Sequence, residues 1–74
     1  MREVSTIKEM EQFIEENENC ILFASQELEE QLSKGLSAFN KGLRATSEEI
    51  ELCFKVYDLQ EKMMNKNIQY RVVK

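Results

Sequence analysis

Acidic side chains are the commonest groups in this chain that could take part in acid–base chemistry. Asp and Glu account for 14 of the 74 residues, and several glutamates are adjacent, as in Glu15-Glu16, Glu29-Glu30 and Glu48-Glu49. Two carboxylates act as acid and base when a shared site shifts their pKa values apart. Neighbouring residues on a helix diverge by roughly 100°. We therefore expect these pairs to form solvated surface.

The hydroxyl and thiol groups lack the partner that usually activates a nucleophile. The chain contains no histidine, which is the commonest general base and metal ligand. Cys20 and Cys53 are too few to form a four-ligand zinc site alone, and we expect both to be small apolar core residues. The two glycines, Gly35 and Gly42, match no phosphate-binding loop. The sequence predicts a protein that is not an enzyme and has no cofactor.

The segment Glu48–Leu59 resembles the entering helix and first loop position of an EF-hand. With Asp58 as the first loop position, the third position is Gln60 and the fifth is Lys62. Met63 replaces the turn glycine. Calcium requires several oxygen ligands and a sharp turn, so we expect no calcium binding here.

A second short segment supplies an enzymatic alternative. Ser25-Gln26-Glu27-Leu28-Glu29 is similar to the serine–x–x–leucine–aspartate signature of small helical-hairpin phosphatases that act on response regulators, with glutamate in place of the aspartate. The resemblance implies that Glu29 or Asp58 is exposed and essential for removing a phosphoryl group from an aspartate.

The net charge of −4 argues against nucleic-acid binding, because phosphates must be neutralised by a basic surface. Residues 1–37 hold nine acidic and three basic side chains, a balance of −6, whereas residues 38–74 hold five and seven, a balance of +2. This asymmetry favours antiparallel contact between the two halves, within one chain or between two. An acidic mimic of nucleic acid, formed by the first half, stays open as an alternative.

The expected location is the cytoplasm. No apolar run approaches the roughly 18 residues of a membrane span, and Met1–Ser5 leads into charged residues rather than the apolar segment of a signal peptide. Two cysteines are also too few for the disulfide framework of a small secreted domain. We expect a single domain over residues 1–74 that does not bind a membrane.

The scarcity of helix-breaking residues predicts an all-α fold. The chain has no proline and two glycines, whereas a β-rich domain needs turn residues about every 8–12 positions. Apolar spacing and capping residues predict an N-terminal helix at about 6–17 and a helical hairpin of about 20–41 and 47–66. Gly42 is expected to end the first arm, with Leu43 folding back onto its last turn. Two such chains could dimerise into a helical bundle.

Two segments leave a small α+β fold as the alternative. Residues 20–24 form a short apolar run that periodicity cannot assign to strand or helix. Residues 68–73 alternate between apolar and polar side chains, which is typical of a strand. Pairing of the two segments would give a small sheet; otherwise residues 67–74 form a flexible or strand-like tail.

The second arm of the hairpin carries more than one apolar stripe. One consists of Ile50, Phe54, Tyr57 and Met64. Because one face suffices for packing in a small domain, a second face is expected to meet a partner, with core packing as the open alternative. The predicted function is a regulator, adaptor or inhibitor that binds a protein partner or a second copy of itself, or alternatively a helical chaperone for a secreted or assembling protein. The predicted interface consists of Leu52, Val56, Leu59, Met63 and Tyr70.

Overall fold

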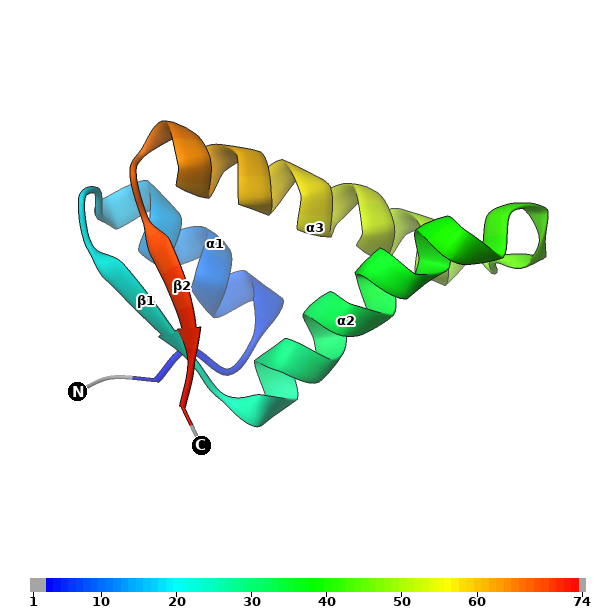
Figure 1. The fold of residues 1–74 in the computed structure, drawn as a ribbon, viewed down its shortest axis with the longest axis horizontal. Coiled ribbons are helices and arrows are strands. Elements are labelled where there is room, and N and C mark those ends of the chain that lie inside the picture. Colours follow the sequence, from blue (N-terminus) through cyan, green and yellow to red (C-terminus); the bar gives the residue numbers. More distant parts are fainter. Residues whose placement is uncertain (1–2, 74) are drawn as a thin grey trace.

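A computed structural model describes residues 3–73, in which three helices accompany a small sheet. The second and third α-helices of the chain form a hairpin whose tip lies far from the strands (Figure 1). In chain order the elements are α1 (Ile7–Glu16), β1 (Ile21–Ala24), α2 (Gln26–Lys41), the 3-10 helix η1 (Gly42–Arg44), α3 (Ser47–Asn65) and β2 (Gln69–Val72).

The two strands pair in parallel. Ile21 lies opposite Gln69 at one end of the ladder and Ala24 lies opposite Val72 at the other. Parallel strands need a long crossover connection, and the whole α2–η1–α3 hairpin supplies it. On the other edge of β1, the Val4 N–H donates a hydrogen bond of 2.8 Å to the Phe23 carbonyl. Strand β1 is therefore paired on both edges.

The prediction of an all-α fold was wrong at residues 20–24 and 68–73, where the structure has the two strands of the α+β alternative. The first hairpin helix begins at Gln26 rather than near residue 20, because Ser25 is its N-cap and the Ser25 hydroxyl accepts a hydrogen bond of 3.3 Å from the Leu28 N–H. The three predicted helices are present, and dimerisation stays a prediction.

The first helix ends in a polar corner that separates it from β1. The Asn17 side-chain amide donates a 2.9 Å hydrogen bond to the Phe13 carbonyl. From the end of α3, the Lys66 ammonium donates to the Ile14 and Glu15 carbonyls, at 2.5 and 3.1 Å. These bonds satisfy carbonyl groups that have no partner within the helix, and they bring the ends of α1 and α3 together.

The hydrophobic core lies between the sheet and the helices and receives side chains from every α-helix and from β1. Within α2, Gly35 allows α3 to approach closely: a Cβ atom at Gly35 would lie 2.6 Å from Val56 Cγ2 and 3.1 Å from the Leu52 carbonyl oxygen. The buried core cluster consists of Val4, Met10, Ile14, Leu22, Ala24, Leu28, Leu32, Val56, Leu59, Met63 and Ile68.

Candidate protein-binding surface

The five predicted interface residues lie on the inner side of α3 and β2. Val56, Leu59 and Met63 are buried, with exposed fractions of 0%, 1% and 7%. Leu52 and Tyr70 are half-buried and pack against the same core. In this conformation the stripe holds the chain together, and contact with a partner would require α3 to leave the core. That these residues contact a partner stays a prediction.

A different set of apolar side chains is exposed, and all of it lies on the hairpin. Phe39, Phe54 and Met64 have exposed fractions of 69%, 71% and 80%, and Leu43 is fully exposed. The other members are between 37% and 44% exposed. We call this set the hairpin face, and it consists of Leu36, Phe39, Leu43, Ile50, Phe54, Tyr57 and Met64.

An aromatic contact connects the α2 and α3 parts of the hairpin face. On α3 the exposed residues follow one another at helical spacing, so they share one side of the helix. The rings of Phe39 on α2 and Tyr57 on α3 meet edge to face, with centroids 6.1 Å apart and an interplanar angle of 69°. This is a favoured geometry for an aromatic pair, and it joins the α2 and α3 parts of the hairpin face.

The α3 half of this face is the first apolar stripe noted in the sequence, but the α2 half was not singled out. The sequence feature that could have revealed the α2 half is the pair of small residues Gly35 and Ala38, which are both buried. Small residues mark the line along which two helices approach most closely. Because α3 packs along this line, Leu36 and Phe39 lie beside the helix–helix contact, where they remain exposed.

The tip of the hairpin differs from the sequence expectation in one respect. Gly42 ends α2 with a positive φ of 56°, in agreement with its assignment as a helix terminator. Leu43, however, does not fold back onto the last turn: its exposed fraction is 106%. Leu43 instead lies in the 3-10 turn Gly42–Arg44, so the hairpin face includes a fully exposed apolar side chain at the tip.

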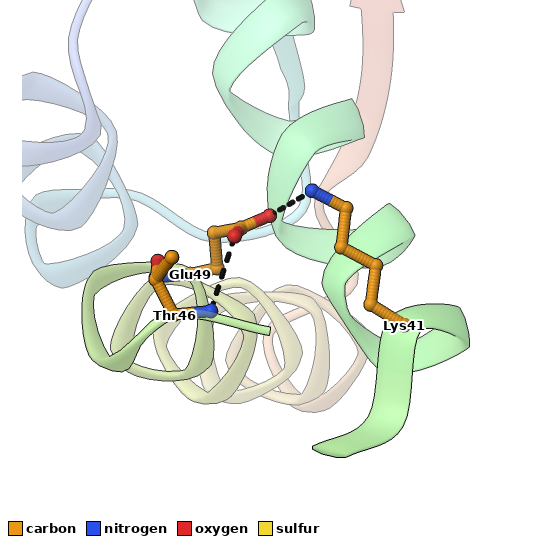
Figure 2. A network of polar contacts seen from close by, with 3 residues as sticks. All are labelled: Lys41, Thr46 and Glu49. Carbon is orange, nitrogen blue, oxygen red and sulfur yellow. Dashed lines mark hydrogen bonds and ion pairs between the residues drawn. The ribbon is translucent and has the colours of Figure 1, made fainter. Parts of the chain in front are cut away.

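A polar network fixes the tip (Figure 2). The Thr46 hydroxyl accepts a hydrogen bond of 3.2 Å from the Glu49 N–H, and the Glu49 carboxylate accepts one of 3.1 Å from the Thr46 N–H, which confirms a capping box at this helix start. The same carboxylate pairs with the Lys41 ammonium at the end of α2. The Lys41 ammonium and then the Thr46 N–H lower the pKa of Glu49 to about 2.

Charged residues are exposed at both ends of the hairpin face. Arg44 is exposed at the tip beside Leu43, whereas Glu61 is exposed one turn beyond Tyr57, toward the end of α3 that leads into the sheet. Glu29 is exposed in the first turn of α2, and its proximity, after burial, helps to raise the pKa of Tyr70 on β2. Both ends also carry charges of the other sign: Glu48 and Glu51 are exposed near the tip, and Lys62 is exposed toward the sheet end.

The segment that resembles the phosphatase signature has a structural role in this fold. Ser25 is buried as the N-cap of α2, and Leu28 is a fully buried core residue. Glu29 is exposed, as the resemblance requires, and so is Asp58. Asp58 pairs with Lys62 at 3.1 Å within one turn of α3, and the helix continues through the segment that resembles a calcium-binding loop.

Comparison with known proteins gives no family for this chain. No protein-family model, curated protein sequence or solved structure matches it. Among residues 3–73, no group of three Cys, Asp or Glu side chains is placed to hold a metal ion. In the same part of the chain, no helix combines the length and apolar character needed to cross a membrane.

Proposed function

We propose that this chain is a small protein-binding module and that the hairpin face is its binding surface. The observation that carries the proposal is that seven large apolar side chains are exposed on a single hairpin, with two of them, Phe39 and Tyr57, in contact across its helices. Soluble monomers rarely expose contiguous apolar patches larger than a few hundred Å², and larger ones mark sites of interaction.

The size of the surface supports this role. At roughly 200 Å² for a large apolar side chain, the exposed fractions correspond to about 900 Å² of apolar surface. A standard protein interface buries about 800 Å² on each partner. Three of the seven residues are aromatic, and both Phe and Tyr are enriched in protein interfaces.

The support beneath the surface is also suited to binding. Val56 and Leu59 anchor α3 in the core, so the exposed stripe of the same helix is presented on a fixed backbone. At the tip, the pairing of Lys41 with Glu49 joins the two helices across their connection. A surface that is ordered before binding loses less conformational entropy when a partner docks.

The regulator, adaptor or inhibitor role proposed from the sequence is retained, with the hairpin face in place of the buried stripe. We also propose a cytoplasmic location, which the two free thiols, Cys20 and Cys53, support.

A site-specific photocrosslinking experiment in native cells tests this function. A photoreactive phenylalanine analogue at Phe54 should form crosslinks to protein, since this side chain is 71% exposed within the hairpin face. The same analogue at Ser37, which is exposed on the polar side of α2 among Lys34 and Lys41, is the matched control. Equal or absent crosslinking at both positions would contradict the proposal.

A further inference from the structure

The two ends of the hairpin face are alike in apolar exposure. Leu43 at the tip and Met64 at the sheet end are its two most exposed members, at 106% and 80%. The aromatic residues Phe39, Phe54 and Tyr57 lie between them along the hairpin. A partner that fits this face must therefore offer apolar contacts at both ends and aromatic contacts in the middle.

We infer that the partner is a second copy of this chain, packed antiparallel on the hairpin face about a two-fold axis; this inference rests on the proposed function. In a two-fold interface, the same surface is used on both molecules, and residue i of one contacts residue j of the other while j contacts i. An antiparallel arrangement places Leu43 of each copy against Met64 of the other. The aromatic residues then meet near the axis.

The pairing of Arg44 with Glu61 favours the antiparallel arrangement over the parallel one. Arg44 lies at the tip, while Glu29 and Glu61 lie toward the sheet end, and all three are exposed. In parallel packing the two Arg44 side chains would face each other, and so would the two Glu61 side chains. In antiparallel packing, Arg44 of each copy faces Glu61 of the other, so this favourable contact occurs twice.

The size and shape of the chain agree with a pair of hairpins. The molecule measures 38 × 26 × 16 Å, so it is flat, with one dimension much shorter than the other two. Two hairpins face to face form a four-helix layer in which the exposed apolar side chains become a second core. The apolar area of the face, about 900 Å² at roughly 200 Å² for each large side chain, is close to the about 800 Å² per partner of a stable interface.

Sedimentation equilibrium on the purified full chain tests the inference, with far-ultraviolet circular dichroism to verify folding. The wild-type chain should associate to a dimer in a concentration-dependent manner. Phe54→Asp should weaken the dimer by about thirtyfold or more, as for loss of a central aromatic contact. Ser37→Asp adds the same charge to the polar side of α2 and should leave the dissociation constant unchanged.

A charge-exchange experiment tests the orientation. Arg44→Glu and Glu61→Arg should each weaken the dimer by about tenfold, because each reversal occurs twice in a symmetric interface. The double variant should recover most of the wild-type affinity. If the double variant is weaker than either single variant, the antiparallel arrangement is overturned.

The outcomes separate this inference from the proposed function. A chain that is monomeric at every concentration, yet crosslinks to another protein through position 54, overturns the second copy and leaves the binding module intact. A dimer whose stability is insensitive to Phe54→Asp also overturns the inference, since it must form through another surface. A monomeric chain with no crosslink specific to position 54 contradicts both.

Discussion

The side-chain amide of Asn67 donates a hydrogen bond of 3.1 Å to the side-chain carbonyl of Asn19, 48 residues earlier in the chain. Both residues have left-handed backbone conformations, with φ of 56° and 53°. The Asn19 N–H donates to the Lys66 carbonyl at 2.9 Å, and the Gln69 N–H donates to the Cys20 carbonyl at 2.9 Å. The two asparagines therefore align the turns from which both strands begin.

Replacement of Asn67 by alanine should destabilise the fold by about 1–2 kcal/mol, because a left-handed backbone is unfavourable for a residue with a Cβ and no local hydrogen bond. Asn67→Gly should lose less stability than Asn67→Ala, since glycine adopts a positive φ without steric penalty. Urea denaturation of the two variants gives the comparison. Asn65→Ala, at the exposed end of α3, is the control and should change stability little. Equal stability of Asn67→Ala and wild type would contradict the proposed role of this corner.

The two stripes of α3 should respond in opposite ways to the same substitution. Val56→Asp places a charge at a fully buried position and should unfold the chain, because an unpaired buried charge costs more than the roughly 3–5 kcal/mol that a core of this size supplies. Phe54→Asp, two residues away, changes a side chain that is 71% exposed and should preserve the helical circular dichroism spectrum. A folded Val56→Asp variant would mean that this stripe is available to a partner, as the sequence alone suggested.

The helices could be predicted from the sequence because their signals are local. The second hairpin helix was predicted at about 47–66 and is observed at Ser47–Asn65, where Thr46 supplies the capping box. The strands were only an alternative because their pairing is not local. Each has four residues, and the register joins segments 48 positions apart, such as Ile21 and Gln69. Short apolar segments carry too little periodicity to choose between helix and strand.

The candidate surface could be predicted only in part. The sequence separates the two stripes of α3 but does not say which one faces the core, because that depends on where α1, α2 and the sheet pack. The close approach of Gly35 to Val56 determines which stripe of α3 faces the core. It draws α2 onto the Val56 side of α3 and leaves Phe54 exposed. A stripe of good interface residues is therefore also a stripe of good core residues until the helix contacts are known.

Replacement of Gly35 by a residue with even the smallest side chain should destabilise the fold. In an unencumbered helix, glycine to alanine stabilises by about 0.5–1 kcal/mol. At Gly35 the added Cβ would lie 2.6 Å from Val56 Cγ2, so we expect Gly35→Ala to destabilise by about 1–3 kcal/mol through overpacking. Urea denaturation measures the change. In a Val56→Ala background the same substitution should cost less, because the methyl group it meets is absent. A stabilising Gly35→Ala, or an equal effect in both backgrounds, would contradict the close helix contact.

Acid should weaken the tip of the hairpin through Glu49. Its pKa in the folded chain is about 2, below the ordinary 4.5, chiefly because of the Lys41 ammonium and then the Thr46 N–H. A depressed carboxyl pKa stabilises the fold at pH values above the unfolded pKa, and this contribution is lost as the pH falls from about 4.5 toward 2.

Lys41→Met should raise the pKa of Glu49 but not restore it fully, because the Thr46 N–H still donates to the carboxylate. Titration of the Glu49 side-chain carboxyl by nuclear magnetic resonance measures this shift. Lys34→Met, which removes an exposed lysine of α2 that does not lower this pKa, should leave it unchanged. An unaltered Glu49 pKa in the Lys41 variant would show that the ion pair across the tip does not form in solution.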